Sequence, residues 1–281
     1  MEQLGYYNGN YGPLEEMQIP MNDRACFFGD GVYDAQPCKN YVIFALDEHV
    51  DRFFNSMKAL EIEPPCSKQE LKDLLNKLVK ELDSDSQFVY YQATRGTAIR
   101  NHVYPDAKTN LWVMLMPKDL PDFSVPMKLI TTEDKRFYYC NVKTLNLIPS
   151  VLASEKAKKA GCDEAVFYRP GGRVTECAHS NVSILKDGTL RTAPTDELIL
   201  PGIARAHLIK AAKALDIPVD ETPFTLDELF AADEVIVTSS FNFCVSASEI
   251  DGKAVGGKDE AHLSALRNWL IDEFEKATTP V

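Results

Sequence analysis

Lys143 lies in a stretch of sequence that carries no other charge. Residues 140–149 read CNVKTLNLIP, and the nearest charged residues along the chain are Arg136 and Glu155. A lysine removed from water loses proton affinity, and its neutral amine is a nucleophile. The more common arrangement is a stem packed on apolar surface with the ammonium in solvent. The segment therefore offers a candidate nucleophile and leaves both arrangements open.

A cluster of cationic residues follows a predicted strand. The segment TRGTAIRNH at 94–102 contains Arg100 and His102, and their side chains point the same way if the backbone there is extended. A guanidinium beside an imidazole can bind a carboxylate or a phosphate, because the planar fork pairs with two oxygens at once. The alternative interpretation is a solvated loop.

Four further stretches could take part in chemistry. GDGVYD at 29–34 indicates a tight turn that enters a strand and presents the hydroxyl of Tyr33. Gly202–Arg205 begins a predicted helix, whose N–H groups and dipole favour an anion. Thr238–Ser240 ends an apolar strand with hydroxyls, and Glu176 ends another strand among small residues. Each also fits an ordinary turn, helix start or solvated glutamate, so none is decisive alone.

The first half of the chain alternates predicted strands and amphipathic helices. Strands are expected at 41–45, 88–94 and 111–116, and a first helix begins at Asp47 with apolar residues at helical spacing. On that helix Arg52 lies opposite the apolar face, so periodicity alone places it in solvent. A second helix follows the capping box of Ser67 and Glu70.

The second half begins after a segment that suits neither helix nor strand. PKDLPDFSVP at 117–126 contains three prolines, and we place the domain boundary there. Beyond it we expect a strand at 127–131, a helix from Pro149 to about Ala160, a β-meander, a helix at 200–215, a short helix capped by Thr225, a strand at 234–240 and a closing helix. The irregular order predicts an α+β fold without a regular doubly wound sheet.

Composition narrows the classes of function. The chain has 281 residues and a formal net charge of -12, which speaks against nucleic acid or an anionic membrane as a partner. The N-terminus has no signal-peptide pattern, and the apolar runs are too short to span a bilayer. Seven scattered cysteines predict reduced thiols in the cytoplasm, and neither they nor the dispersed histidines form a metal-ligand pattern. No phosphate-loop or dinucleotide motif occurs.

The order of the motifs is more specific than any single motif. GDGVYD, DEHVDR, TRGTAIRNH, NVKTLN, VTECAHSN, LPGIAR and VTSS together resemble the fold-type IV aminotransferases, which use pyridoxal 5'-phosphate (PLP), and RNH at 100–102 resembles their D-amino-acid branch. The resemblance covers about residues 29–252. It implies a homodimer, a smaller N-terminal α/β domain (1–118), a linker (119–126) and a larger, β-rich, barrel-like PLP-binding domain (127–281), with PLP in the cleft between the domains.

The resemblance also implies roles for individual residues. Lys143 would hold PLP as a Schiff base and move the proton at the substrate Cα, and Glu176 would keep the pyridine nitrogen protonated. The implied phosphate contacts are Arg52, Ile203, Ala204, Ser239 and Ser240. The implied contacts of the substrate carboxylate are Tyr33, Arg100 and His102. Placing the carboxylate there would present the D-enantiomer to Lys143.

Some positions depart from the commonest pattern of that branch. Ala204 stands where a threonine often adds a hydroxyl to the phosphate, so that contact must come from the backbone. Cys177, Ala178 and His179 replace a run of glycine and serines, and Phe241 makes the next loop more apolar. These changes bear on the range of accepted substrates.

We therefore expect a transaminase that converts D-alanine and 2-oxoglutarate to pyruvate and D-glutamate. The alternatives of the same fold are an aminodeoxychorismate lyase and a transaminase acting on L-branched-chain acids or (R)-amines. The Arg–His pair favours the D-amino-acid enzyme over these. A PLP-binding protein without turnover is a further alternative, disfavoured by the presence of both Lys143 and Glu176.

Overall fold

The chain folds into two compact units that are not contiguous in sequence. The computed structural model describes residues 1–279. Unit 1 comprises Met1–Leu120, Val142–Asn146 and the residues from Glu275 onward, and unit 2 comprises Pro121–Asn141 and Leu147–Phe274. The segment around Lys143 was expected in the second domain, whereas its contacts group it with unit 1. The division at Leu120 falls within the segment where we expected a linker.

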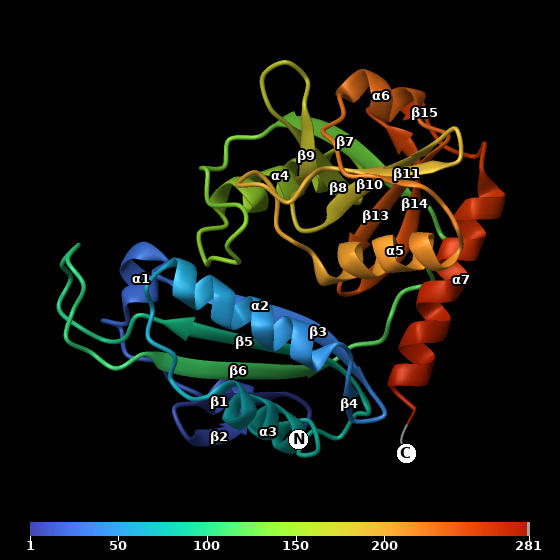
Figure 1. Ribbon diagram of the computed structural model, residues 1–281. Helices are drawn as coiled ribbons and strands as arrows, with labels where there is room; N and C mark the ends of the chain where they lie inside the picture. Colours follow the sequence, from blue (N-terminus) through green and yellow to red (C-terminus); the bar gives the residue numbers. More distant parts are fainter. Residues whose placement is uncertain (280–281) are drawn as a thin grey trace. The chain divides into compact units, whose positions relative to one another are not determined.

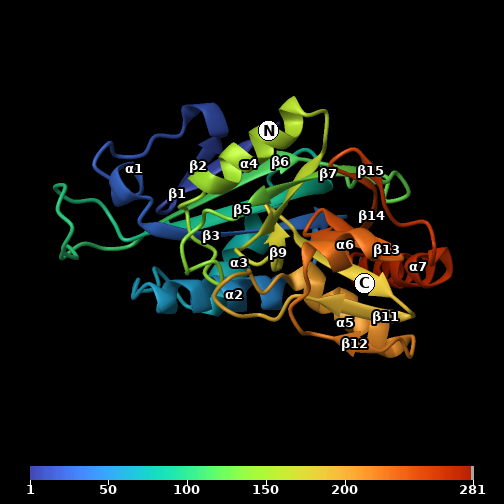
Figure 2. The same ribbon diagram turned by 90° about the horizontal axis from the view of Figure 1, so that it is seen from above.

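Unit 1 contains an antiparallel six-stranded sheet in the order β2-β1-β6-β5-β3-β4. Figure 2 shows β3, β5 and β6 side by side along their length. Its strands are β1 (Leu4–Tyr7), β2 (Asn10–Pro13), β3 (Gly31–Lys39), β4 (Val42–Ile43), β5 (Ser86–Thr94) and β6 (Asn110–Pro117). Its helices are α1 (Arg24–Phe28), α2 (Leu46–Ala59) and α3 (Lys68–Leu78), with a short 3-10 turn, η1 (Leu14–Glu16).

One face of this sheet packs against the apolar faces of α2 and α3. Phe53 of α2 and Leu75 of α3 share a core with Val89 and Tyr91 of β5, which alternate with half-exposed residues along the strand. The capping box of Ser67 and Glu70 is present at the start of α3, as predicted. The strand expected at 41–45 is wrong in length, because only β4 pairs and the backbone turns left-handed at Ala45 before α2.

Unit 2 contains a mixed nine-stranded sheet in the order β12-β11-β10-β13-β14-β7-β8-β9, with β15 paired to β14. The strands are β7 (Met127–Glu133), β8 (Glu164–Tyr168), β9 (Val174–Cys177), β10 (Asn181–Lys186), β11 (Thr189–Thr192), β12 (Val219–Asp220), β13 (Glu234–Ser239), β14 (Asn242–Ile250) and β15 (Lys253–Ala254). The terminal strand β9 lies against β10, so the sheet curls back on itself, and the expected barrel-like shape is confirmed.

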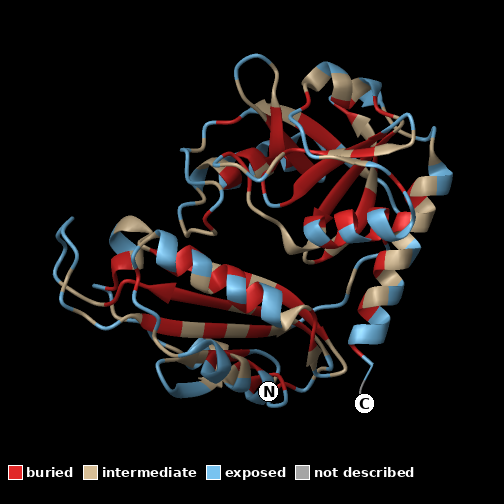
Figure 3. Ribbon diagram, in the orientation of Figure 1, coloured by how far each residue is buried: buried red, intermediate tan, exposed pale blue. Residues whose placement is uncertain are grey.

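Four helices accompany this sheet: α4 (Ile148–Lys159), α5 (Ile203–Ala214), α6 (Leu226–Ala231) and α7 (Glu260–Ala277). α5 packs against β13 and β14 (Figure 1). In each unit the buried residues concentrate in the central strands and on the helix faces toward them (Figure 3). The mixed architecture confirms the predicted α+β class. Within residues 1–279 no helix is both long and apolar enough to cross a membrane.

Candidate functional site

Lys143 is positioned by its main chain. The carbonyl of Lys143 accepts a hydrogen bond from the amide of Tyr33 at 2.9 Å, and its own amide donates to Ser56 Oγ at 3.2 Å. Leu145 donates to the carbonyl of Gly31, so the segment Val142–Asn146 lies along the edge of β3. A Cβ at Gly31 would approach the carbonyl oxygen of Ala93 to 2.5 Å and Leu145 to 2.7 Å. The glycine at that position therefore allows the lysine segment to dock.

The ammonium of Lys143 lies over an aromatic ring. Its Nζ is 4.3 Å from the ring centre of Tyr33, a cation–π distance, and the Tyr33 ring stacks on that of Tyr90 at 5.4 Å. The side chain is half-buried, and within residues 1–279 no ion pair involves it. An amine held over a tyrosine ring can serve as a nucleophile or a proton carrier.

Arg52 is buried, which corrects the periodicity-based expectation that it lies in solvent. Its side chain is 9% exposed, because Asp34 on β3 lies beneath α2 and compensates its charge. Nε donates to Asp34 Oδ2 at 2.9 Å and Nη2 to Oδ1 at 2.7 Å, and His49 Nδ1 lies 2.7 Å from the same Oδ1. Burial opposes the negative charge of Asp34, but Arg52 and His49 outweigh it and hold the pKa of that carboxyl well below its usual range. The implied role of Arg52 toward a phosphate stays a prediction.

Arg100 and His102 lie in the long loop between β5 and β6, which Figure 1 shows projecting from the sheet. The backbone there is irregular, so the extended geometry assumed from the sequence is wrong. The two side chains nevertheless meet on one ring: the Arg100 guanidinium carbon lies 5.0 Å from the centre of Phe28, and the His102 ring 5.2 Å from it. Buried Arg24 supports the loop by donating to the carbonyl of Asn101 at 2.6 Å.

Arg95, the third cation of the loop motif, has a structural position. Its Nε lies 3.0 Å from both carboxylate oxygens of Asp30, and its terminal nitrogens donate to the carbonyls of Leu60 and Glu61. Asp30 also accepts from Arg24 Nε at 2.7 Å. Asp30 therefore ties the turn before β3 to the two arginines that flank the loop.

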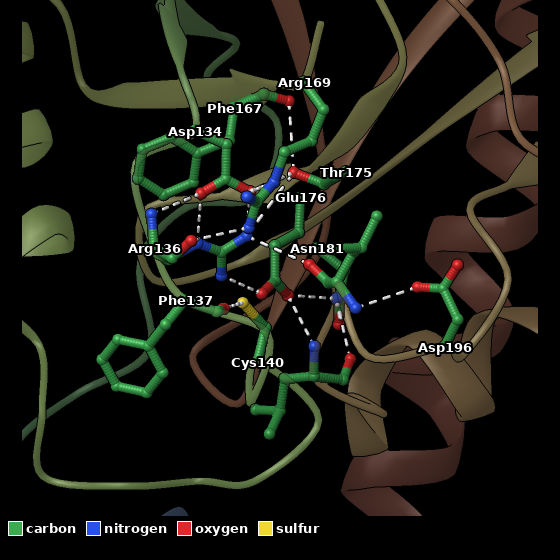
Figure 4. A network of polar contacts seen from close by, with 12 residues as sticks. Asp134, Arg136, Phe137, Cys140, Phe167, Arg169, Thr175, Glu176, Asn181 and Asp196 are labelled. Atoms are coloured by element: carbon green, nitrogen blue, oxygen red, sulfur yellow. Dashed lines mark hydrogen bonds and ion pairs between the residues drawn. The ribbon is translucent and has the colours of Figure 1, made fainter.

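Glu176, at the end of β9, is buried and held by donors on both carboxylate oxygens (Figure 4). Arg136 Nη1 donates to Oε1, while Asn181 Nδ2 and the amide of Leu200 donate to Oε2 at 2.9 and 3.0 Å. A carboxylate that receives these donors is stabilised as an anion. Such an anion can stabilise a cationic ring nitrogen.

The N-terminus of α5 is tied to the same cluster. Gly202 is the N-cap residue, so the cap itself offers no side-chain acceptor to the first amides of the helix, those of Ile203 and Ala204. Asn181 donates to the carbonyl of Leu200 at 3.1 Å, and a Cβ on Gly202 would approach Asn181 Oδ1 to 2.0 Å. A larger residue at position 202 would displace Asn181, so the glycine keeps the start of α5 close to Glu176. Free amides at a helix start can bind an anion.

The remaining expected residues have identifiable local roles. Ser239 Oγ accepts from the amide of Asn242 at 3.1 Å and closes the tight hairpin between β13 and β14, in which Ser240 lies. His179 Nδ1 lies 2.7 Å from Oε2 of the buried Glu164, and Ser180 Oγ donates to the same oxygen. His179, one of the positions that depart from the commonest pattern, is therefore anchored to Glu164.

Sequence reasoning missed several residues that position this site. Asp34 and His49 lie inside two motifs that we used for the resemblance, and the i,i+3 spacing of His49 and Arg52 places them on one helix face. Arg136 was noted only as a neighbouring charge. Nothing in the sequence indicated that Asn181 or Arg136 contacts Glu176, because those contacts join separate strands and loops.

Comparisons with known proteins agree on one family. Residues 31–250 match the family described as Amino-transferase class IV. The chain is 39% identical to the D-alanine aminotransferase of Listeria monocytogenes and 35% identical to that of Staphylococcus epidermidis, each over 96% of both chains.

Solved structures show the same fold. The branched-chain amino acid aminotransferase of Escherichia coli superposes with a TM-score of 0.89 at 22% identity, over 98% of this chain and 95% of that one. The branched-chain amino acid aminotransferase of T.th. HB-8, complexed with N-(5'-phosphopyridoxyl)-L-glutamate, superposes with a TM-score of 0.87 at 27% identity, over 98% and 94%.

Proposed function

The chain belongs to the class IV aminotransferase family, and on that premise we propose that it uses PLP to transfer the amino group of a D-amino acid to a 2-oxo acid. D-Alanine and 2-oxoglutarate are the proposed pair. The D-alanine aminotransferases of Listeria and Staphylococcus, at 35 to 39% identity over nearly the full length, support this choice over the branched-chain enzymes at 22 to 27%.

One observation carries the proposal: the Lys143 ammonium lies 4.3 Å from the ring centre of Tyr33 while both backbone polar groups of Lys143 are hydrogen-bonded. The lysine is thus fixed at its main chain, and its side chain lies beside the tyrosine that we assign to the substrate carboxylate. In this proposal Lys143 Nζ would hold the cofactor and would carry the proton at the substrate Cα.

The polar groups described above suit the binding of PLP. PLP, when bound, supplies an aldehyde that condenses with amines and a pyridinium ring that accepts electrons when the Cα–H bond breaks. Glu176 holds the proton on the ring nitrogen. The first amides of α5, at Ile203 and Ala204, and the hydroxyls of Ser239 and Ser240 bind the phosphate, and Arg52 adds a positive charge fixed by Asp34.

Substrate recognition is assigned to Tyr33, Arg100 and His102. The overall charge of -12 repels an anionic substrate, so the carboxylate must be bound by local cations. Arg100 and His102 gather on Phe28, which gives them a rigid support on an otherwise exposed loop. With the carboxylate held there, the Cα–H bond of the D-enantiomer points toward Lys143.

We also propose that the protein is a cytoplasmic homodimer. Unit 1 exposes large apolar side chains at Met21, Ile99 and Val103, which are 91%, 88% and 72% exposed. A second copy that covers them would remove this apolar area from water. Light scattering coupled to gel filtration tests the dimer, and a monomer at micromolar concentration would contradict it.

A spectroscopic screen tests the activity itself. The purified protein is loaded with PLP, and its absorbance is followed on addition of single D- or L-amino acids without an oxo acid. We expect D-alanine to change the spectrum and to release pyruvate, with turnover continuing only when 2-oxoglutarate is added. Equal rates with L-alanine would overturn the assignment of chirality. Pyruvate formation from aminodeoxychorismate without an oxo acid would identify a lyase instead.

A further inference from the structure

Glu176 is held between a cation on one carboxylate oxygen and neutral donors on the other. Arg136 donates to Oε1, and the amides of Asn181 and Leu200 donate to Oε2. Arg136 cannot move away, because its Nε and Nη2 donate to the two oxygens of Asp134 at 3.0 and 2.8 Å and its guanidinium carbon lies 4.6 Å from the ring centre of Phe167. The amides of Asn181 and Leu200 orient the carboxylate of Glu176, and the guanidinium of Arg136 places a positive charge beside it.

Arg136 belongs to a buried cluster in which the charges balance. Arg136 lies between Asp134 and Glu176, and Arg169 Nε lies 3.1 Å from Asp134 Oδ2 (Figure 4). The Asp134 side chain is fully buried, and those of Arg136 and Arg169 are each 13% exposed. Two carboxylates thus share two guanidinium groups. Removing the charge of Arg136 would leave Asp134 with Arg169, whereas Glu176 would lose the guanidinium that contacts its Oε1.

We propose that Arg136 is a positioning residue whose charge keeps Glu176 anionic, so that the proton shared between Glu176 and the ring nitrogen of PLP stays on the nitrogen. This inference rests on the proposed function, in which Glu176 faces that nitrogen. Arg136 acts through Glu176 and contacts neither substrate nor cofactor in this assignment.

The titratable groups of the same cluster leave Arg136 charged and the neighbouring thiols neutral. Burial raises the pKa of Cys140 to about 11 and also raises the pKa of Cys177, so both thiols are neutral near pH 7. Burial opposes the charge of Asp134, but Arg136 and Arg169 hold the pKa of that carboxyl below its usual range. Burial likewise opposes the charge of Arg136, and Asp134 and Glu176 outweigh it and raise its pKa. Arg136 is therefore a permanent cation at Glu176.

The charge of Arg136 would affect the position of one proton, which the Glu176 carboxylate and the pyridine nitrogen of PLP would share. When an anionic carboxylate faces a protonated pyridine, the proton can sit on nitrogen or on oxygen, and the more basic atom holds it. A cation in contact with the carboxylate lowers the basicity of the oxygen more than that of the nitrogen beyond it. Loss of the cation shifts the proton toward oxygen, and a neutral pyridine withdraws electrons from the reacting carbon less strongly.

The protonation state of the PLP ring nitrogen can be measured directly. The full chain is loaded with PLP labelled with ¹⁵N at the ring nitrogen, and the NMR shift of that nitrogen is followed against pH. In the wild-type protein we expect a pyridinium signal that persists across neutral pH. Arg136→Gln keeps an amide donor but removes the charge, and its signal should move toward that of an unprotonated pyridine. Arg136→Lys keeps the charge and should retain the wild-type signal.

Arg169→Gln is the matched control. Arg169 pairs with Asp134 and donates to the backbone carbonyl of Arg136 at 2.8 Å, so its loss perturbs the same cluster through Asp134. We expect Arg169→Gln to lower thermal stability while the nitrogen signal stays that of a pyridinium. An Arg169→Gln signal that moves as far as that of Arg136→Gln would mean that general disruption of the cluster suffices, and would overturn the proposal.

The outcomes separate this inference from the proposed function. A wild-type protein that takes up no PLP contradicts the function first. If the wild-type protein takes up PLP and folded Arg136→Gln keeps a pyridinium signal, the function stands and the role of Arg136 is refuted. If Arg136→Gln does not fold, Arg136→Lys decides alone, because an unprotonated nitrogen in that variant would show that charge at this position is not what matters.

Discussion

Lys143 and Glu176 are held in contrasting ways. Lys143 in unit 1 is fixed through backbone hydrogen bonds to Tyr33 and Ser56, and its ammonium touches an aromatic ring. Glu176 in unit 2 is fixed through its side chain, with donors on both carboxylate oxygens. In the proposed reaction Lys143 moves a proton, and fixing only its main chain leaves its side chain free to do so. Glu176 is proposed to stay charged, and the donors on its carboxylate oxygens favour that state.

The largest expected effect comes from Lys143→Ala. The two backbone hydrogen bonds of residue 143 survive the substitution, so we expect the thermal midpoint to change little while turnover disappears. Borohydride reduction of the PLP-loaded wild-type protein, followed by mass spectrometry, should place the label on Lys143. A label on a different lysine would refute the assignment.

A second prediction concerns the support of Arg52. Asp34→Asn removes the charge that compensates a buried guanidinium and should lower the free energy of unfolding by about 3–5 kcal/mol near neutral pH. The pKa of Asp34 is lower in the folded protein than in the unfolded chain, so its contribution is full above about pH 5 and declines as the pH falls through the unfolded-state pKa.

Urea unfolding at a series of pH values measures this contribution. The gap in stability between wild type and Asp34→Asn should narrow from about pH 5 to about pH 3. Asp51→Asn is a suitable control, because Asp51 lies on the same helix in an exposed ion pair with Lys68. A gap that stays constant with pH would contradict the assignment of the charge to Asp34.

A third prediction tests the proposed role of the Glu176 carboxylate. Glu176→Gln keeps the size of the side chain but removes the charge that favours a protonated ring nitrogen. We expect kcat for D-alanine to fall by about 100-fold or more, with PLP occupancy much less affected, because the substitution does not alter the residues proposed to bind the phosphate. Steady-state kinetics and absorbance titration measure the two quantities, and near-full kcat would rule out this role.

The fourth prediction addresses the loop on Phe28. Arg100→Lys keeps the charge but loses the two-pronged fork, so KM should rise for both D-alanine and 2-oxoglutarate, since both present a carboxylate. The loss corresponds to about 2–5 kcal/mol, or roughly thirty-fold or more in kcat/KM. His102→Ala should act in the same direction but less. Unchanged constants for Arg100→Lys would contradict the carboxylate site.

Much of the fold could be predicted because its signals are local. The capping boxes at Ser67 and Thr225 and the glycine before α5 mark helix starts that the structure confirms within about two residues. The hairpin of β1 and β2 was missed although Asn8-Gly9, with positive φ at both residues, is a strong turn signal. β14 was also missed, because its polar residues interrupt the apolar run that marks a buried strand.

The site was less predictable because its positions depend on contacts distant in sequence. Periodicity placed Arg52 in solvent, since nothing local shows that Asp34 lies beneath it. The resemblance implied Glu176, but no pattern along the chain indicated that Arg136, forty residues earlier, reaches it. The local sequence indicates the type of a residue and the face of the helix or strand on which it lies. The residue that its side chain contacts depends on the topology of the sheet.

The discontinuity of unit 1 has a consequence for the order of events during synthesis. When residues up to Leu120 have left the ribosome, all six strands of the first sheet are present, but the segment Val142–Asn146 that carries Lys143 is not. That segment is synthesised later, and the contacts from Lys39 to Glu275 and from Asn40 to Thr278 can form only after it. A fragment ending at Leu120 would therefore display the open edge of β3 at Gly31–Tyr33. A separate peptide of residues 142–146 should bind to that edge and form the hydrogen bonds that it makes in the full chain.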